Sequence, residues 1–413
     1  MTSRGSHAVR GQAWKRGTAR RWVLALVLVG CERDPRAQRV QALETAERAQ
    51  APVRVASFNA SLTRAHAGGL RRELAGGASV QARQAAAIVQ RVRPDVLLLL
   101  EVDRDPEALA ILERDYLAVP QPDGGDGLTF AHRFVPATNT GLASGLDLDH
   151  DGRTDGPGDA LGYGAFPGQY GMVVLSRHPI DIDGIRCFGD LRWRDVDGAR
   201  LPDDPVTPAP ADWYSEPALD VLPLSSKNHC IVPISIEGQP GPLHLLLSHP
   251  VPPVFDGPED RNGLRNHDEI RLWAQLLDGA PGLPVLLPSR ARFVLAGDLN
   301  ADPHDGDTTG DPVGRWLLGH PRIAAEPVPA STGSIEASRR DGGANASHSG
   351  PASHDTADFP DVDGGPGNLR VDYVLPSKSL EVLGAGVFWP AAGEPGVELV
   401  ACSDHRLVWI DVR

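Results

Sequence analysis

The sequence is poor in aromatic residues, cysteine and lysine, and each shortage excludes a class of protein. Aromatic residues make up 5% of the 413 positions, so the chain offers few surfaces on which nucleic-acid bases could stack. Four cysteines are too few for a fold that depends on a disulfide scaffold. Lysine occurs only at Lys15, Lys227 and Lys378, so arginine carries nearly all of the positive charge.

Negative charge dominates the chain, which has a formal net charge of −14. Six of the 40 Lys and Arg residues lie in the first 21 residues, which contain no Asp or Glu, so the remainder carries 34 basic and 54 acidic residues and a net charge of −20. A body this acidic has no general electrostatic attraction to nucleic acid. If the protein acts on a phosphate ester, the positive charge at the site must come from metal ions or from local arginines.

The basic N-terminal segment leads into a short apolar run, Trp22–Val29, which is followed by Gly30 and Cys31. This order is typical of a secretory signal. The run of about eight residues is too short to span a bilayer as a helix, which takes roughly 20 residues. Leu28–Cys31 resembles the bacterial lipobox, in which the cysteine is lipidated and becomes the mature N-terminus. The alternative is an ordinary cleaved signal with an incidental cysteine.

We therefore predict that residues 1–31 are a lipoprotein signal peptide and that residues 32–50, which are polar, are a flexible tether. The protein would be exported and held by a lipid anchor at the periplasmic or cell-surface side of a membrane. In such a compartment Cys187 and Cys230 could form a disulfide, although the sequence alone leaves the pairing open.

Apolar strand patterns alternate with helical patterns along the rest of the chain, which favours a layered α/β fold. Asp95–Glu101 is a continuous apolar run ending in an acid, as expected of a strand buried on both faces. Helical periodicity covers residues 79–92, closed by Pro94, and residues 263–278. Further strands are predicted at Val53–Phe58, Gly171–Ser176, His229–Ile236, Leu243–Ser248, Arg292–Gly297, Leu369–Leu375 and Arg406–Val412.

Three long insertions rich in loop-forming residues separate these elements. Residues 121–168 are rich in Gly and Asp, residues 189–228 in Pro and Asp, and residues 326–368 in Ser, Gly, Ala and Asp. Structureless loops of this length are uncommon in a compact domain and are usually functional or disordered. None of the three is long or apolar enough to form a separate folded domain.

Polar residues stand at or just beyond the C-terminal ends of the predicted apolar strands. They are Asn59, Glu101, His249, Asp298 and Asn300. Ligand sites of α/β sheets gather at such strand ends. Each residue alone also fits a structural role, such as a turn cap, a solvated strand end or an Asx-turn. Only their occurrence together indicates a site.

Together these residues resemble the motifs of the endonuclease/exonuclease/phosphatase superfamily, the DNase I-like metal-dependent phosphoesterases. The matching pieces stand in the family's order: Ser57-Phe58-Asn59; Pro94-Asp95 to Glu101; Gly171 to Ser176-Arg177; Ser248-His249; Gly297-Asp298-Leu299-Asn300; Arg370-Val371-Asp372-Tyr373; and Ser403-Asp404-His405. The resemblance covers residues 51–413. It implies a four-layer α/β sandwich, in which two mixed β-sheets pack face to face and are flanked by helices, with long loop insertions.

The resemblance implies a site for Mg²⁺ or Mn²⁺. Hard cations of this kind bind few protein carboxylates and keep several waters. Glu101 is the expected first ligand, and Asn59 supplies a neutral amide oxygen beside it. Asp404, in the terminal motif, matches an acid that lies at or near the metal in the family.

The resemblance also implies roles in catalysis. Asp298 and Asn300 would position and activate the attacking water, and whether the acid is the base or a second metal ligand stays open. His249 and His405 would flank the scissile phosphate as acid, base or charge stabilisers. Asp372 would hold the ring of His405 and favour its charged form.

Two features depart from the family pattern or fit it less closely. The family often has Thr before the mid-chain histidine and Leu after it, whereas this chain has Ser248-His249-Pro250, which could tilt the ring. The sequence identifies no acid partner for His249. Asn139 is a weaker candidate for phosphate contact, and a turn residue is an equally good interpretation.

One insertion carries a motif of its own. Asp147, Asp149 and Asp151, followed by Gly152 and Asp155, have the spacing of a calcium-binding loop. The match is partial, because the twelfth position is a glycine where a bidentate Glu is usual. An acidic solvated loop is the alternative.

The sequence thus predicts a divalent-metal-dependent hydrolase of phosphate esters that uses an activated water, with Mg²⁺ or Mn²⁺ and a further Ca²⁺ as candidate ions. The alternative is a non-catalytic surface binding protein on the same fold, because fold does not imply function. The presence of every acid and histidine of the motifs favours catalysis. Substrates to consider are nucleic acid, a phospholipid head group or a small phosphodiester, and the acidic body disfavours the first. We expect a monomer.

Overall fold

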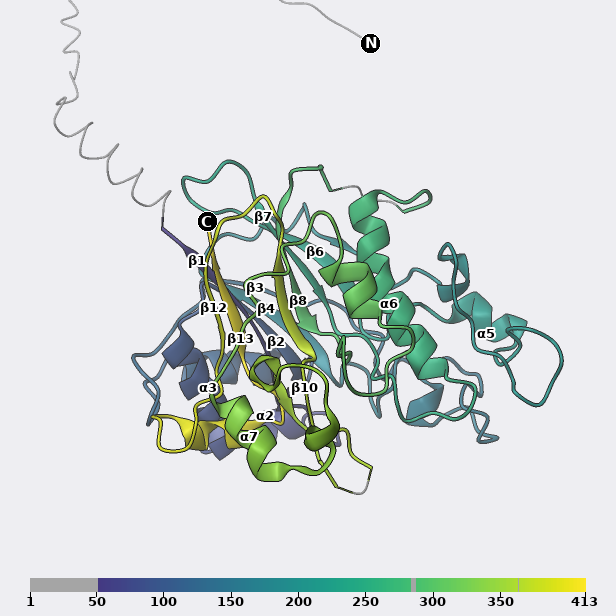
Figure 1. Ribbon diagram of the computed structural model, residues 1–413, viewed down its shortest axis with the longest axis horizontal. Helices are drawn as coiled ribbons and strands as arrows, with labels where there is room; N and C mark the ends of the chain where they lie inside the picture. The colour runs from purple at the N-terminus through teal and green to yellow at the C-terminus, as the bar shows by residue number, and fades with distance from the viewer. Residues whose placement is uncertain (1–50, 284–286, 363) are drawn as a thin grey trace, which may run out of the picture. The chain divides into compact units, whose positions relative to one another are not determined.

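The computed structural model describes residues 51–283, 287–362 and 364–413, which include two large mixed β-sheets and the helices that cover them (Figure 1). The predicted signal peptide and tether, with Cys31, lie outside the described residues. Within the described part no helix is long and apolar enough to cross a membrane.

The first sheet has six strands in the order β12-β13-β1-β2-β4-β3. Its two central strands, β1 and β2, run parallel, and every other pair is antiparallel. The strands are β1 (Val53–Leu62), β2 (Val96–Val102), β3 (His132–Phe134), β4 (Gly171–Ser176), β12 (Val382–Val387) and β13 (Val408–Val412).

The second sheet has five strands in the order β11-β8-β7-β6-β5, in which β7 and β8 run parallel and the other pairs are antiparallel. The strands are β5 (Arg186–Cys187), β6 (His229–Ile234), β7 (Leu243–Ser248), β8 (Arg292–Asp298) and β11 (Asp372–Pro376). A two-stranded ribbon joins β9 (Ala357–Asp358) to β10 (Asn368–Leu369).

Helices cover the outer faces of the two sheets, so the predicted four-layer sandwich is confirmed. The described α-helices are α2 (Gly69–Leu74), α3 (Val80–Val92), α4 (Pro106–Ile111), α5 (Glu216–Val221), α6 (Arg261–Asp278) and α7 (Gly333–Asp341). Side chains of α2, α3 and α4 pack on the first sheet, and those of α5 and α6 pack on the second. Figure 1 shows α3 and α6 on opposite sides of the strands.

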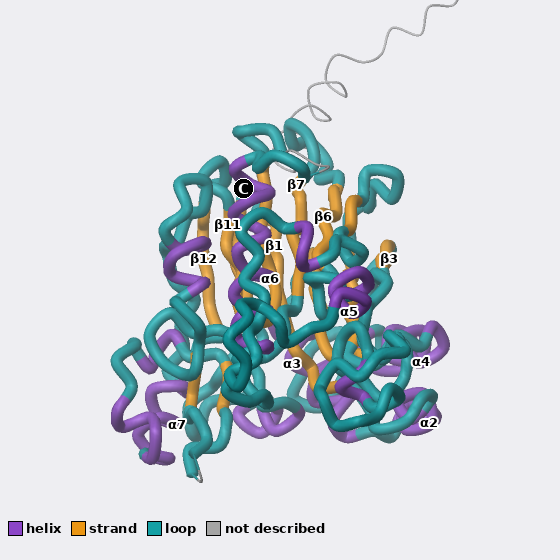
Figure 2. The backbone as a smooth tube through the Cα atoms, turned by 90° about the vertical axis from the view of Figure 1, so that its right-hand side faces the viewer, coloured by secondary structure: helices purple, strands orange, loops and turns teal. Residues whose placement is uncertain are grey.

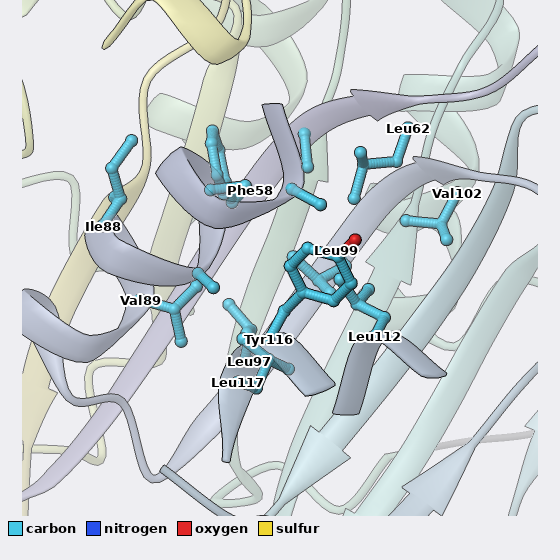
Figure 3. Packing of buried hydrophobic residues seen from close by; sticks show 14 of the residues in the cluster. Phe58, Leu62, Ile88, Val89, Leu97, Leu99, Val102, Leu112, Tyr116 and Leu117 are labelled. Carbon is cyan, nitrogen blue, oxygen red and sulfur yellow. The ribbon is translucent and has the colours of Figure 1, made fainter. Parts of the chain in front are cut away.

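Strand β2 shows why the sequence forms this arrangement. Its alternate residues Leu97 and Leu99 pack against α3 and its neighbours (Figure 3). Val96, Leu98 and Leu100 point the other way and pack between the two sheets. A strand enclosed on both faces has to be apolar at every position, which is the pattern the sequence shows.

The same alternation occurs in the second sheet. Phe293 and Leu295 of β8 pack under α6, where they meet Trp273. Val294 and Ala296 face the first sheet. Two-sided burial of both parallel pairs fixes the register of the central strands, since a slip of one residue would exchange the two faces.

The segments between the strands differ partly from the prediction. Figure 2 shows how much of the chain outside the sheets is loop, but the insertion at 326–368 contains α7 and is not structureless. The predicted strand Leu369–Leu375 is divided into β10 and β11. The disulfide between Cys187 and Cys230 is present and links β5 to β6.

We predict that the inter-sheet core dominates stability. Leu98 is fully buried there, so Leu98→Ala should lower the free energy of unfolding by about 2–5 kcal/mol. The matched control is Leu383→Ala in β12, where the side chain is 46% exposed and the expected loss is under about 1 kcal/mol. Urea denaturation of both variants measures the difference. Equal losses would contradict the assigned core.

Candidate active site

The topology brings the predicted polar residues to one end of the sandwich. The C-terminal ends of β1 and β2 carry Asn59 and Glu101, and those of β7 and β8 carry His249 and Asp298. Strand β11 runs antiparallel to β8 and begins at this end, where Asp372 is the register partner of Asp298. Both sheets therefore contribute to the site.

The carboxylate of Asp298 lies at the centre and is completely buried. Its Oδ2 accepts a hydrogen bond from Asn59 Nδ2 at 3.1 Å. The same oxygen lies 3.4 Å from His249 Nε2 and 3.7 Å from His405 Nε2. Its Oδ1 accepts from the backbone N–H of Asn300 at 2.9 Å. The acid partner of His249 that the sequence left unidentified is thus Asp298.

A second carboxylate holds the far side of the His405 ring. Nδ1 of His405 is 2.9 Å from Asp372 Oδ2. The same oxygen accepts from Thr356 Oγ1 at 2.9 Å, and the remaining oxygen of Asp372 is buried without a hydrogen-bond partner among the described residues. The ring is therefore held between Asp372 and Asp298, with one nitrogen directed at each.

The surroundings shift the pKa values of the two histidines in opposite directions. Burial alone would lower the pKa of His405, but the carboxylates of Asp372 and Asp298 raise it above the usual range of histidine. Burial, with the nearby Lys227 ammonium, lowers the pKa of His249. Burial alone would raise the pKa of Asp298, but the rings of His405 and His249 hold it well below its usual range. At neutral pH this gives an ionised Asp298, a charged His405 and a neutral His249.

Glu101 stands at an irregularity in its strand. The register of β2 shifts between Leu100 and Val102 relative to both neighbours, and Glu101 has a φ of 54°. A bulge with a residue in the left-handed region re-aims the side chain, and such strained residues cluster at functional sites. Strand β2 continues to Val102, so Glu101 lies in a bulge where the sequence pattern had placed a strand end.

The predicted metal ligands offer oxygen donors that suit a hard cation. Among the described residues, nothing forms a hydrogen bond or ion pair with the carboxylates of Glu101 and Asp404, and the Asn59 amide oxygen accepts from Ser61 N at 3.2 Å. The compact acid–histidine group of the site is a different one, Asp298, Asp372 and His405, whose ligand atoms all lie within 4.8 Å of one another. Glu101 and Asp404 do not belong to it.

The side chains of Asn300 and Asn139 donate hydrogen bonds to backbone carbonyls. Asn300 has a φ of 51°, and its Nδ2 donates to the carbonyl of Pro250 at 3.1 Å, which ties the loop after β8 to the loop after β7. Nδ2 of Asn139 donates to the carbonyls of Gly189 and Ser225 at 2.6 and 2.8 Å. Both amide protons of Asn139 are used within the protein, which favours the turn interpretation over phosphate contact.

The candidate calcium loop forms a partial cluster. Asp147, Asp149 and Asp151 bring carboxylate oxygens within 4.8 Å of one another. Asp155 does not join them and pairs with Arg153 at 2.8 Å. The geometry therefore gathers three of the four predicted ligands.

The sequence pattern missed two charged residues next to the site. Glu269 of α6 is buried, and its carboxylate accepts from the backbone N–H groups of Ser226 at 2.7 Å and Val251 at 2.8 Å. Glu269 thereby ties the segment that leads into β6, at Ser226, to the loop after β7, at Val251. Lys227, also buried, lies beside Glu101 and His249. The rarity of lysine in the sequence was a feature that could have drawn attention to Lys227.

Known proteins resemble this chain in fold and in family. No curated protein matches the sequence significantly. Solved structures with similar folds include an endonuclease/exonuclease/phosphatase from Beutenbergia cavernae (19% identity, TM-score 0.46, 88% of this chain and 72% of that one). Others are sphingomyelinase C from Streptomyces griseocarneus (17%, 0.42, 87% and 99%) and the TDP2 protein of Caenorhabditis elegans (16%, 0.41, 93% and 81%).

A family model matches the sequence more clearly than any of these solved structures does. The model of the Endonuclease/Exonuclease/phosphatase family covers residues 56–405. That range spans most of the chain and runs from β1 to His405, so it contains every strand of the second sheet, all but β13 and the start of β1 in the first, and every residue of the Asp298 cluster. The chain belongs to the endonuclease/exonuclease/phosphatase family.

Proposed function

We propose that the protein hydrolyses phosphate esters with the help of a divalent cation and an activated water. The observation that carries the proposal is the buried carboxylate of Asp298, whose Oδ2 lies 3.4 Å from His249 Nε2 and 3.7 Å from His405 Nε2. Groups whose pKa values are driven apart by their surroundings are the usual basis for acid–base assignments.

Each member of the cluster has a step that its geometry allows. Asp298 can orient a water as a hydrogen-bond acceptor, because its carboxylate is held in the ionised form. The charged His405 can stabilise negative charge that develops on the phosphoryl oxygens. The neutral His249 directs Nε2 at Asp298, and its Nδ1 is buried without a partner among the described residues, free to accept a hydrogen bond.

Glu101, Asn59 and Asp404 would hold the cation, since their oxygens are of the type that Mg²⁺ or Mn²⁺ prefers. When bound, such an ion supplies charge neutralisation at the phosphoryl oxygens. We further propose Ca²⁺ for the loop of Asp147, Asp149 and Asp151, a role separate from the reaction.

The alternative is a binding protein that uses the same site without turnover. The charged His405, together with a cation held by Glu101, would also serve to bind a phosphate ester. Turnover distinguishes the two: a binding protein would take up the ester and release it intact. Two features favour the enzyme, because simple anion binding requires neither: the strained backbone at Glu101, and the opposite shifts of the pKa values of His249 and His405.

We also propose export and lipid anchoring through Cys31. The substrates reached there would be small phosphodiesters, lipid head groups or extracellular nucleic acid. The tether of roughly 20 residues would let the domain sample soluble substrate near a bilayer. We propose that the domain acts as a monomer, because the residues of the cluster all come from one chain.

Glu101→Gln tests the cation site. The variant keeps the shape of the side chain and removes its charge, so metal affinity should weaken and the rate of phosphodiester hydrolysis should fall by about 100-fold or more. Glu398→Gln, at an exposed position in the turn before Cys402, is the matched control and should leave both unchanged. Wild-type activity that persists in excess chelator would contradict the proposal.

Asp372→Asn tests the His405 pair. Because the folded pKa of His405 lies above its unfolded value of about 6.5, the stabilisation from the charged ring is complete below that value and is lost as the pH rises through the folded pKa. The wild-type melting temperature should therefore fall on the alkaline side. The variant should show a weaker dependence that begins at lower pH, because Asp298 still raises the pKa of His405 while the contribution of Asp372 is lost.

The same variant should lower kcat by roughly 10- to 100-fold, as expected when the partner that orients a functional histidine is removed. Asp307→Asn, at an exposed position outside the His405 contacts, should change neither quantity. Thermal melts across pH and steady-state kinetics measure the two effects. An unchanged alkaline limb in Asp372→Asn would argue against the assigned protonation of His405.

Cys31→Ser tests the lipid anchor. Replacement of the cysteine should move the protein from the membrane fraction to the soluble fraction or block its processing. Mass spectrometry of the mature N-terminus checks the assignment directly. A mature protein that begins at another residue and carries no lipid would overturn it.

A further inference from the structure

Lys227 lies in a run of five buried polar residues, Ser225–His229, whose last residue is the first of β6. The backbone of this run is fixed on both sides. The Ser225 hydroxyl and His229 Nδ1 are 2.7 Å apart, and Glu269 binds both the N–H and the hydroxyl of Ser226, at 2.7 and 3.0 Å. The position of Lys227 is therefore set by the fold.

The charge of Lys227 is not neutralised by a direct partner. The side chain is 7% exposed, and its ammonium donates one hydrogen bond, to the carbonyl of Pro250 at 3.3 Å. Among the described residues no carboxylate oxygen lies within 4.0 Å of it. The nearby Glu269 is already engaged by Ser226 and Val251. Burial lowers the pKa of Lys227, and the more distant carboxylates of Glu269 and Glu101 act against this shift. A bound anion would supply the direct partner that the buried ammonium lacks.

The ammonium lines a cavity of about 550 Å³ that also contains Glu101 and His249. One part of its wall is apolar and aromatic and includes Tyr170, Tyr214 and Val254, with Tyr163 and Phe255 at exposed positions. Another part is charged and contains Asp149, Arg261 and Arg265. A cavity of this size suits one compact organic group, and it joins the proposed reaction centre at Glu101 and His249.

We propose that Lys227 is a substrate-binding residue whose ammonium donates to a non-bridging phosphoryl oxygen, while the cavity binds the organic substituent of the ester. The substrate class is a phosphate ester with one compact, partly aromatic or apolar substituent. This inference rests on the proposed function and extends it, because Lys227 lies outside the family motifs that carry the reaction.

The two halves of the proposal support each other. A charge-assisted hydrogen bond would fix the phosphoryl group, and the aromatic part of the wall would pack against the uncharged substituent. The other two lysines of the chain do not offer this. Lys15 lies outside the described residues, and Lys378 is exposed at the C-terminal end of β11, the end opposite Asp372.

Lys227→Met tests the ammonium, because it keeps the length of the side chain and removes the charge. With bis(4-nitrophenyl) phosphate as the substrate, kcat/KM should fall roughly 10- to 100-fold. Calorimetry should show inorganic phosphate binding weakened by a similar factor. Lys227→Arg should restore part of both. Lys378→Met, the matched control, should resemble wild type. Unchanged kcat/KM and phosphate affinity in Lys227→Met would overturn the inference.

Val254→Trp tests the cavity while leaving the lysine intact, so it also decides the case in which Lys227→Met fails to fold. The larger side chain should raise KM for bis(4-nitrophenyl) phosphate several-fold, and it should change KM little for methyl 4-nitrophenyl phosphate bound through its smaller group. Equal effects on the two esters would overturn the assignment of the cavity.

Failure of this inference is distinguishable from failure of the proposed function. If the wild-type chain hydrolyses no ester but binds phosphate in a Lys227-dependent way, the proposed function fails and the anion site stands. If Glu101→Gln abolishes turnover while Lys227→Met leaves kcat/KM and phosphate binding intact, the proposed function stands and the role of Lys227 fails.

Discussion

A carboxylate buried between two β-sheets needs compensation, and the compensation of Asp298 organises this site. Its partners come from both sheets: Asn59 from β1, His249 from the end of β7 and His405 from the segment before β13. An ionised carboxylate in this position would be unstable without hydrogen-bond donors and positive charge. The contacts that compensate its burial also connect β1 of the first sheet to the ends of β7 and β8 in the second. Stability and the arrangement of the reacting groups therefore depend on the same carboxylate.

The remaining polar groups extend this arrangement outward. Asp372 fixes the far nitrogen of His405, and Thr356 fixes Asp372. Pro250 accepts hydrogen bonds from Asn300 and from Lys227 through one carbonyl, which joins the loops after β7 and β8 to the segment before β6. His405, Asp372 and Asn300 are thus each held by neighbouring groups, so a displacement of one would be transmitted to the others.

The sequence predicted the elements better than the contacts between them. Apolar runs located β2 and β4, because two-sided burial leaves a period-free apolar signature. Family motifs named Asp298 and His405. The bulge at Glu101 had no local signal, since the left-handed backbone there is imposed by pairing on both sides. The contact of His249 with Asp298 joins residues 49 positions apart, and only the parallel pairing of β7 with β8 brings them together.

Charge explains why such a site suits a small substrate. The chain carries a formal net charge of −14, so a polyanion approaching it meets repulsion along its whole length. A ligand with a single phosphate is exposed to little of that field, because charges beyond about 8 Å are largely screened at physiological ionic strength. Inside the site His405 and Lys227 would offer it positive charge at short range, among the carboxylates of the cluster and in a low-dielectric setting where each interaction is strongest. This distribution of charge supports the proposal of a compact monoanionic ester over a long nucleic acid.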